Sequence, residues 1–507
     1  MKILFQTFRE SALIIILLFF NSCLSFLEED NKSTITQENY FINANQAQTA
    51  VIGAYTGLNT FIMRSNYGES PFISIELPVG HSKTLGQSAH NNNLIGQRSA
   101  ATELPFKHVW VGFYKAIANA NQVIEKLPEV NMDDNKKKSL MGEVYFLRAF
   151  YYYHLVRLYG DIPLITDIMT TANPNFYPER TSVDKIYEQI VSDLKNAETS
   201  GLPNYDPNGK VCLGMVKSLM ASVYLTMAGF PLNKGGEYYT LAANKAEEVI
   251  DGGWYSPLFS DYAYLHDRAH KLKNEFILQV QVLMGTNDLG TNGIAQLIIP
   301  EKSGISKFAD EYGSLTPIDA FVESYETGDK RAREKQYFFS SYIKNGIEIK
   351  FGGYGLYKYW LEEAAGENGD QKSDENWTLL RLPEIMLIYA EATNEVNGPT
   401  DKALQQLITI RNRAELSTPA LGTFTKETFR EFIWKERYHE LAYENKAYFD
   451  IQRTHKVYNL KAGKFVDAFT FLNESGVTFK EQYLLWPIPS DEINANPKLK
   501  PQNPGWD

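Results

Sequence analysis

The chain contains very little cysteine. Only Cys23 and Cys212 occur among its 507 residues, which is too few for a disulfide framework or for a cysteine-rich zinc site. Cys212 lies in the apolar helical stretch KVCLGMVKSLMASVYL, so we expect a buried, unreactive thiol there. Cys23 lies in a different setting near the N-terminus and needs a separate explanation.

An excess of basic residues is also missing, as are long apolar runs. The net charge of -11 argues against a nucleic-acid partner, which would need a basic stripe. After the first residues, no segment approaches the roughly 20 apolar residues of a spanning helix. The G-x-S-x-G, H-E-x-x-H and phosphate-loop motifs and any Cys/His pairing are absent as well. We therefore predict that the protein is not an enzyme and has no cofactor or metal site.

The N-terminus has the features of a secretion signal. Lys2 and Arg9 supply positive charge, and residues 12–20 form an unbroken apolar run that is too short to stay in a bilayer. Ser22 and Cys23 follow, and a small residue before a cysteine is typical of a lipoprotein signal, in which the cysteine is acylated. The alternative is a plain secretion signal with an incidental cysteine. Two or more acyl chains would anchor the protein stably.

From this pattern we predict three N-terminal parts. Residues 1–22 form the signal peptide, and residues 23–37 form the lipidated N-terminus and a polar tether, with a helix beginning near Thr36. Cys23 is the predicted lipid attachment site. The acidic residues in LEED, soon after it, are compatible both with a solvated tether and with an export address.

Aromatic residues are abundant, at 13% of the chain with 31 Tyr and 29 Phe. Most of these rings must lie in the core. Exposed rings would suit flat apolar surfaces, such as sugar rings or peptide side chains. Composition leaves both uses open.

Apolar residues recur at helical spacing in many segments. An aromatic-rich helix is repeatedly followed by one with small residues and aliphatics, which resembles tetratricopeptide units without their strict Trp and Leu-Gly pattern. We predict a mainly α fold: tetratricopeptide-like helix pairs that form a right-handed superhelical scaffold, with a long irregular region carrying a few short strands. The expected helices include residues 46–62, 109–127, 139–159, 182–198, 216–228, 238–251, 382–397 and 401–416.

Two long irregular stretches interrupt the helices, at about residues 64–106 and 254–377. The second contains EFILQVQVL, which suits a strand. Loops of this length inside a compact domain are uncommon unless they have a function. We therefore expect the ligand site in these two stretches.

Three glutamates form a stripe on one predicted helix, because Glu436, Glu440 and Glu444 are spaced four residues apart. Such a stripe suits either a catalytic or metal-binding carboxylate site or a set of structural ion pairs with arginines. A metal site built on helices would need Glu-x-x-His pairs on facing helices. Only His439 lies between these glutamates, so we favour structural ion pairs.

Four segments in order, EVYFLRAFYYYHLVRLYGDIPL, RLPEIMLIYAEATNE, ERYHELAYENKAYFDIQR and YLLWPIPSDEINANPKLKPQNPGW, carry a family resemblance. The chain resembles the SusD/RagB family of outer-membrane nutrient-binding lipoproteins, from Cys23 to Trp506. It departs from the usual Glu-Gly-x-Arg stretch, since Asn445 replaces the glycine and Ala447 the arginine. Asn tolerates a left-handed backbone, so the first change is mild. The second removes a charge and puts one ion pair in doubt.

The resemblance implies the following fold and function. Helix pairs support an irregular ligand site in a single SusD-like domain, here residues 38–507, with insertions at about 64–106 and 254–377. The protein is lipid-anchored in the outer membrane, faces the cell exterior, and caps a SusC-like TonB-dependent transporter. Together they take up oligosaccharide or polysaccharide. The alternative ligand is a peptide or another nutrient. Two rival functions are also considered: a surface glycoside hydrolase, which would use two carboxylates, and a pure protein-interaction scaffold.

The binding residues of the family do not transfer by motif, so we chose candidates by chemical type. A sugar ring needs an aromatic platform together with amide or guanidinium hydrogen-bonding groups. For each candidate, packing in the core or solvation in a loop is the alternative role. The segment SAHNNNLIGQ is the first choice for ligand contact, because amides concentrated in a loop have little use in packing. The candidates are Tyr67, His81, Asn91, Asn92 and Arg98 in the first stretch and Tyr264, Phe308, Tyr312, Tyr354 and Trp360 in the second.

Overall fold

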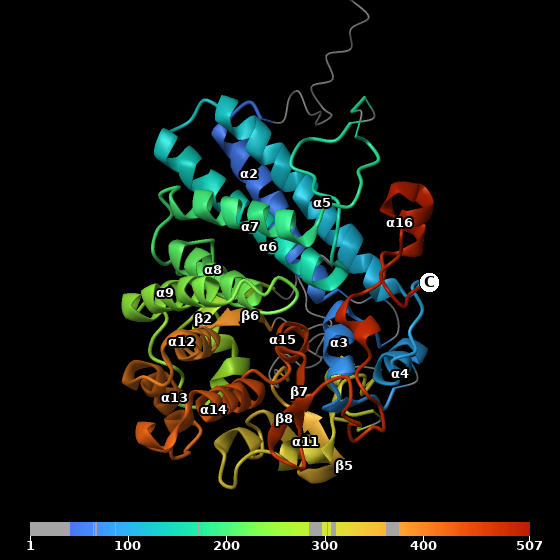
Figure 1. Cartoon of the computed structure of the whole chain (residues 1–507), viewed down its shortest axis with the longest axis vertical. Helices are drawn as coiled ribbons and strands as arrows, with labels where there is room; N and C mark the ends of the chain where they lie inside the picture. Colours follow the sequence, from blue (N-terminus) through green and yellow to red (C-terminus); the bar gives the residue numbers. More distant parts are fainter. Residues whose placement is uncertain are drawn as a thin grey trace, which may run out of the picture.

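A computed structural model describes residues 41–507 except 64, 66–67, 87, 171, 174, 283–296, 302, 306–310 and 361–374. The described chain is mainly helical, as predicted, and its long helices are stacked in layers (Figure 1). These helices are α2 (Ala44–Tyr55), α5 (Leu104–Lys126), α6 (Asp134–Tyr159), α7 (Val183–Glu198), α8 (Leu213–Ala228), α9 (Gly236–Gly252), α12 (Leu382–Asn397), α13 (Asp401–Arg413) and α14 (Lys426–Glu440).

Each long helix packs against its neighbours in the stack. Helix α5 contacts α2 and α6, α6 contacts α7, and α8 contacts α7 and α9. Helix α12 then joins α9 to α13 and α14. A single helix pair cannot bury both of its faces, whereas stacked pairs bury them against each other. The tetratricopeptide-like arrangement predicted from the repeats is therefore confirmed.

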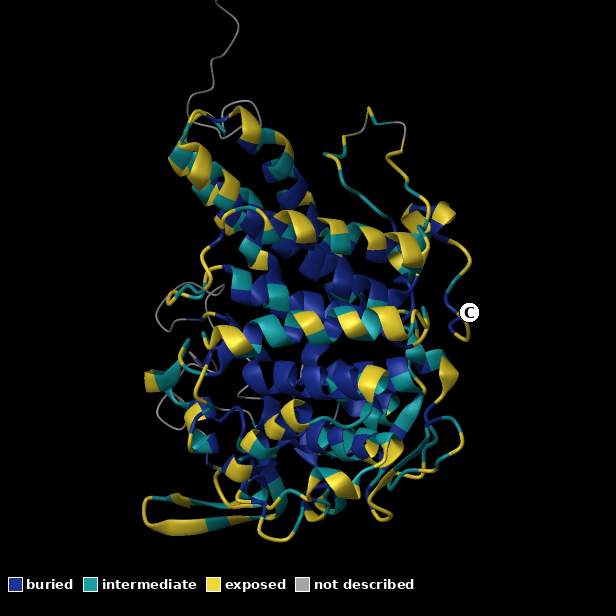
Figure 2. Ribbon diagram, turned by 60° about the vertical axis from the view of Figure 1, so that its left-hand side comes forward, coloured by how far each residue is buried: buried dark blue, intermediate teal, exposed yellow. Residues whose placement is uncertain are grey.

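Most of the aromatic residues serve the core, which is continuous through the stack (Figure 2). Helix α6 is buried on several sides, as its apolar residues on every face predict. Its tyrosines also satisfy backbone carbonyls, since the hydroxyl of Tyr151 donates to Ala54 O at 2.5 Å and that of Tyr152 to Ile165 O at 2.7 Å. Buried tyrosine hydroxyls need such partners.

The strands pair two by two, and every pair is antiparallel. The strand expected from EFILQVQVL is confirmed as β2. The remaining short helices are α3 (Pro71–Glu76), α4 (Ala89–Ile95), α11 (Asp319–Glu323), α15 (Ala447–Thr454) and α16 (Ser490–Ala495). The strand pairs are β1 (Ser82–Lys83) with β3 (Thr316–Pro317), β2 (Phe276–Val280) with β6 (Trp377–Arg381), β4 (Phe338–Lys344) with β5 (Ile347–Leu356), and β7 (Lys456–Asn459) with β8 (Lys464–Asp467).

The first irregular stretch is more ordered than its composition predicts. SAHNNNLIGQ, expected to be a loop, forms helix α4, because the hydroxyl of Ser88 accepts from the backbone N–H of Asn91 and caps the helix. The amides are used locally as well. Asn92 Nδ2 donates to Ser88 O at 2.9 Å, and Asn93 Nδ2 reaches the carboxylate of Glu103. The prediction of an amide-rich loop was wrong.

The predicted signal peptide, Cys23, the tether and the helix beginning near Thr36 lie outside the described residues. The first described helix, α2, is capped by Asn43. Within the part of the chain that the structure describes, none of the helices combines the length and apolarity needed to cross a bilayer.

Candidate ligand-binding face

The three glutamates of the predicted stripe are buried and paired with basic side chains. The single long helix expected to carry them was wrong, because α14 ends at Glu440, Glu444 lies in the turn after it, and α15 follows. Glu440, which is completely buried, lies 2.6 Å from Arg381 and 3.1 Å from Arg331 and also pairs with Arg413. The prediction of structural ion pairs is confirmed. We call the whole set the ion-pair hub: Glu275, Glu436, Glu440, Glu444, Arg331, Arg381, Arg411, Arg413 and Lys358.

The other two glutamates of the stripe are held in the same way. Glu436 lies 2.6 Å from Arg331 and 2.9 Å from Arg411, and Glu444 lies 2.5 Å from Lys358. Each pair joins α14, or the turn after it, to a segment far away in sequence. The hub thereby fixes the second irregular stretch to the helical stack.

The hub is built to hold charge rather than to transfer protons. Burial alone would raise the pKa of Glu440, but Arg413, Arg381 and Arg331 outweigh it and lower that pKa to about 2. Burial lowers the pKa of His439 to about 3, so this ring is neutral at physiological pH. Within the described residues, no group of three His, Cys, Asp or Glu side chains could hold a metal ion.

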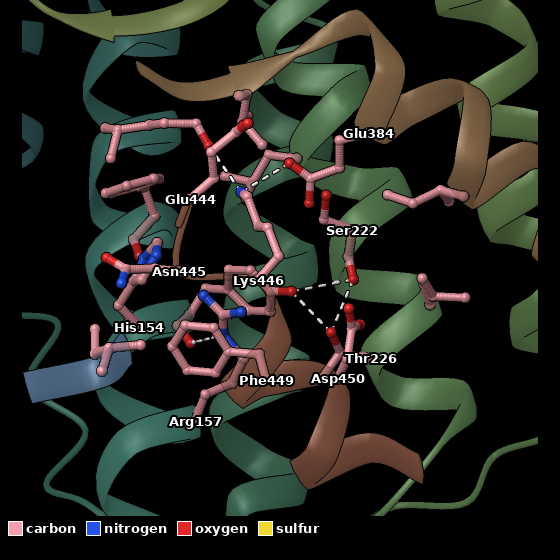
Figure 3. A pocket seen from close by; sticks show the side chains of 18 of the residues that line it. His154, Arg157, Ser222, Thr226, Glu384, Glu444, Asn445, Lys446, Phe449 and Asp450 are labelled. Carbon is pink, nitrogen blue, oxygen red and sulfur yellow. Dashed lines mark hydrogen bonds and ion pairs between the residues drawn. The ribbon is translucent and has the colours of Figure 1, made fainter. Parts of the chain in front are cut away.

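A small internal cavity lies beside the hub and has a volume of about 60 Å³. Its polar groups bind one another, as Figure 3 shows for Lys446, which lies 2.7 Å from a Glu384 carboxylate oxygen. The guanidinium of Arg157 is held 3.7 Å from the ring centres of both Tyr153 and Phe449. A cavity of this size holds water molecules but no sugar ring. The cavity is therefore part of the packing rather than a ligand site.

Two of the predicted ligand contacts are buried. His81 is fully buried, with its ring nitrogens 3.2 Å from the carboxylate of Glu76 and 3.2 Å from the hydroxyl of Tyr438. Trp360 packs with Ile299, Ile305 and Phe339 in a small core of its own. The structure does not support His81 and Trp360 as ligand contacts, because neither ring reaches the surface.

The other candidates are scattered over several environments. Asn92 and Arg98 are exposed on and just after α4. The ring of Tyr264 is 38% exposed and stacks on His270, with centroids 4.4 Å apart. Asn91 is buried, and its Nδ2 donates to Gly68 O at 2.9 Å. Tyr67 and Phe308 lie outside the described residues.

Tyr312 marks the place where the two irregular stretches meet. The N–H of Leu85 donates to Gly313 O at 2.8 Å, and β1 pairs with β3 beside it. Glycines allow the approach: a Cβ on Gly86 would lie 2.6 Å from Tyr312 O, and one on Gly68 would lie 2.7 Å from the hydroxyl of Ser314. Asn91, which binds Gly68, is tied to the same place.

Strand β5, which carries Tyr354, runs beside this place at Gly353. A Cβ on the preceding residue, Gly353, would lie 3.4 Å from the carboxylate of Asp319 and 3.7 Å from Lys83 Nζ. Lys83 and Asp319 form an ion pair at 3.9 Å. We call this surface the β1–β3 face: Gly68, Lys83, Leu85, Gly86, Tyr312, Asp319 and Tyr354.

Sequence reasoning missed five residues of this face, two of which are the glycines Gly68 and Gly86. Leu85 is 42% exposed although it is apolar, and Lys83 of β1 forms its ion pair with Asp319 at the start of α11. The one available signal was Gly86, since a glycine next to a short strand indicates a close approach of another backbone. Nothing in the local sequence indicated which segment would approach.

A stack of helix pairs that supports a polar and aromatic face made by long insertions is the architecture of a helical-repeat binding protein. Two family profiles match the chain: "SusD family" over residues 323–506 and "Starch-binding associating with outer membrane" over residues 25–207. A crystal structure of a SusD superfamily protein from Parabacteroides distasonis is 34% identical, covers 93% of this chain and 100% of its own, and has a TM-score of 0.86. The chain belongs to the SusD family.

Two further relatives extend the comparison. SusD-like protein P2 of Formosa agariphila is 28% identical over 97% of this chain and 98% of its own length. Surface glycan-binding protein A from Bacteroides thetaiotaomicron is 20% identical, with a TM-score of 0.75 over 92% of this chain and 100% of its own. At that identity, the second likeness shows the fold alone. The resemblance read from the four sequence motifs is confirmed.

Proposed function

We propose that this protein is a cell-surface lipoprotein that binds an oligosaccharide or polysaccharide and delivers it to a SusC-like TonB-dependent transporter of the outer membrane. The observation that carries the proposal is the β1–β3 face, where half-exposed Tyr312, the charged pair of Lys83 and Asp319, and the strand that carries Tyr354 adjoin one another. Tyrosine rings suit the C–H faces of a sugar, and the charged groups suit its hydroxyls. The starch-binding description of the family and the name of the glycan-binding relative agree with this chemistry.

Binding without chemistry is the function that the ion-pair hub favours. A glycoside hydrolase needs a carboxylic acid with a raised pKa near a second carboxylate. Glu440 and Glu444 of the ion-pair hub have the opposite character. Burial would raise the pKa of each, but three neighbouring arginines lower that of Glu440 to about 2, and Arg381 and Lys358 lower that of Glu444. Release of reducing ends from laminarin or starch by the purified protein would contradict this part of the proposal.

The proposal includes the membrane anchor and the domain limits. Residues 1–22 are removed as a signal, Cys23 carries the lipid, residues 23–37 form the tether, and residues 38–507 form one domain outside the cell. Replacing Cys23 with Ser should move the protein from the membrane to the soluble fraction. Cys212→Ser is the matched control and should leave the protein in the membrane fraction. Retention of the Cys23→Ser protein would contradict the anchor.

Binding is tested by calorimetry and by electrophoresis through gels that contain laminarin, starch or xylan. Tyr312→Ala and Tyr354→Ala should each weaken binding about tenfold, because each ring contributes about 1 kcal/mol or more. Leu472→Ala is the control, since Leu472 is 62% exposed and lies outside the β1–β3 face. Binding of peptides but of no glycan would support the alternative ligand class. Unchanged affinity in both tyrosine variants would exclude this face.

A further inference from the structure

A second surface remains after the β1–β3 face and the hub are accounted for. Two adjoining hollows, of about 680 and 620 Å³, lie on either side of the segment 163–182 and share Ile165, Asp167, Met169, Tyr177 and Pro178. We call the larger one the α5 groove. Its walls are the outer side of α5, the segment 163–178, and residues 492–499 in and after α16. In Figure 1 this segment and the β4–β5 hairpin lie toward opposite ends of the long axis.

The walls of the α5 groove are held in place by specific bonds. The segment closes on itself where Ile162 and Thr181 exchange backbone hydrogen bonds of 3.2 and 2.8 Å. Asn496 Nδ2 donates to Pro178 O at 2.7 Å, and the hydroxyl of Tyr114 donates to Pro163 O at 2.8 Å. The groove is therefore anchored to α5 and to the C-terminal segment, not formed by an unattached loop.

Aromatic rings line the α5 groove at two depths. Trp110 and Tyr114 lie on α5 with their ring centres 4.9 Å apart, and Trp110 is buried. Phe176 and Tyr177 stand at the rim, 41% and 52% exposed, with ring centres 5.1 Å apart at 83°. Two neighbouring, largely exposed aromatic residues are unusual on a surface that binds nothing, because each loses the free energy of burial.

Polar side chains without protein partners point to the chemistry of the ligand. Gln122 from α5, Asp167 from the segment and Glu492 from α16 all line the groove. None of these three side chains has a hydrogen-bond or ion-pair partner among the described residues. One amide and two carboxylates, from three different walls, are thus available to accept hydrogen bonds from hydroxyl groups.

We infer that the α5 groove is a second carbohydrate-binding site, for an uncharged oligosaccharide. Phe176 and Tyr177 would contact the C–H faces of the sugar, and Asp167, Glu492 and Gln122 would bind its hydroxyls. A volume of about 680 Å³ lies within the range of small-molecule sites, about 300–1,000 Å³. The carboxylates outnumber the single lysine of the groove, Lys115, so acidic sugars are disfavoured.

A bound peptide fits the α5 groove less well. Extended peptides usually add backbone hydrogen bonds to a free strand edge. One wall here is a helix whose backbone is satisfied internally, and none of the described β-strands lines the groove. Hydroxyl-rich sugars match side-chain acceptors next to aromatic rings. The carbohydrate class of the ligand rests on the proposed function. The site itself does not, because the α5 groove shares no residue with the β1–β3 face.

Two sites on one chain would change how a polysaccharide is held. A polymer long enough to reach both sites would bind the second one intramolecularly, and overall affinity would then exceed that of either site alone by about 10²–10⁴. A short oligosaccharide would occupy the two sites independently. The polysaccharide therefore reports on linked binding at the two sites, and the short oligosaccharide reports on the number of sites.

The test uses the full chain with Cys23→Ser and titrates laminariheptaose and maltoheptaose by calorimetry. The protein without further substitutions should bind two molecules per chain. The double variant Phe176→Ala/Tyr177→Ala should bind one, and its affinity for the parent polymer, laminarin or starch, should fall at least tenfold. Tyr312→Ala should bind one molecule with unchanged affinity, through the groove, and a second about tenfold more weakly, at the β1–β3 face. Leu472→Ala is the control and should bind two, and alginate should not occupy the groove.

Three outcomes would overturn the inference. One molecule bound per chain, unaffected by the groove variant, would leave the proposed function intact and remove the second site. A groove variant that keeps both molecules but no longer copurifies with the transporter would assign the groove to a protein contact. If neither heptasaccharide nor any polymer binds the chain, the inference fails together with the proposed function. The double variant Asp167→Asn/Glu492→Gln gives an independent check. Like the Phe176→Ala/Tyr177→Ala variant, it should bind one molecule per chain.

Discussion

Neutralising the centre of the ion-pair hub should cost the protein a large part of its stability. Glu440 is completely buried and accepts from Arg381, Arg331 and Arg413 and from the hydroxyl of Tyr262. In Glu440→Gln the shape of the side chain is kept while its charge is lost. The guanidinium groups then stay buried with less negative charge around them.

The size of the loss follows from two independent considerations. Removing one partner of a buried ion pair typically costs about 3–5 kcal/mol. The pKa of Glu440 falls from 4.5 to about 2 in the folded protein, which corresponds to about 3 kcal/mol of stabilisation by the charged form. Because the folded pKa is the lower one, this contribution is complete above about pH 4.5 and is lost as the pH falls toward 2.

Urea unfolding, followed by tryptophan fluorescence at several pH values, measures the effect. At pH 7, Glu440→Gln should lower the free energy of unfolding by about 3–5 kcal/mol, and its stability should depend less on pH between 4.5 and 2 than that of the original protein. Glu431→Gln, at an exposed position of the same helix, is the control and should stay within about 0.5 kcal/mol. A loss below about 1 kcal/mol in Glu440→Gln would refute the reasoning.

Three further predictions concern local features of the structure. Asn445→Ala should lower stability by about 1–2 kcal/mol in urea titrations, because Asn445 has φ of 57° and binds Glu76, while Asn445→Gly should cost less. Gly57→Ala should cost about 1–3 kcal/mol by thermal unfolding, since the added Cβ would lie 2.7 Å from the ring of Tyr151. Cys212 is buried and its pKa is raised, chiefly by burial, so a thiol reagent at pH 8 should label it only in denaturant; fast labelling of the folded chain would contradict this.

Much of the helical scaffold could be predicted because its signals are local. The helix expected from Ser182 onward begins at Val183, and the expected stop at Gly160 ends α6. The ion pairs of the three glutamates were also interpreted correctly, because buried carboxylates need basic partners, although Glu444 lies in the turn after α14 and not on the helix. The left-handed backbone of Asn445 agrees with the expectation that asparagine tolerates this conformation.

The ligand face could be predicted only in part, because burial there is decided by segments far away in sequence. Tyr312 and Trp360 look alike as candidates, yet Trp360 is covered by Ile299, Ile305 and Phe339, while Tyr312 stays half-exposed. Composition also misled in SAHNNNLIGQ, where a single serine cap turned an expected loop into a helix. The groove beside α5 was not anticipated at all, since its rings come from a segment that the helical pattern passes over.

The buried candidate His81 explains how the β1–β3 face is kept rigid. Its backbone carbonyl accepts from the N–H of Ile318 at 3.2 Å and from the hydroxyl of Tyr443 at 3.2 Å, so one residue joins the face to the turn after α14. Glu76, which binds the His81 ring, also accepts from Asn445 in that turn. A face fixed in this way loses little conformational entropy when a sugar binds. His81 and Asn91, which sequence reasoning assigned to ligand contact, therefore lie one layer deeper, where they hold residues of the face in place.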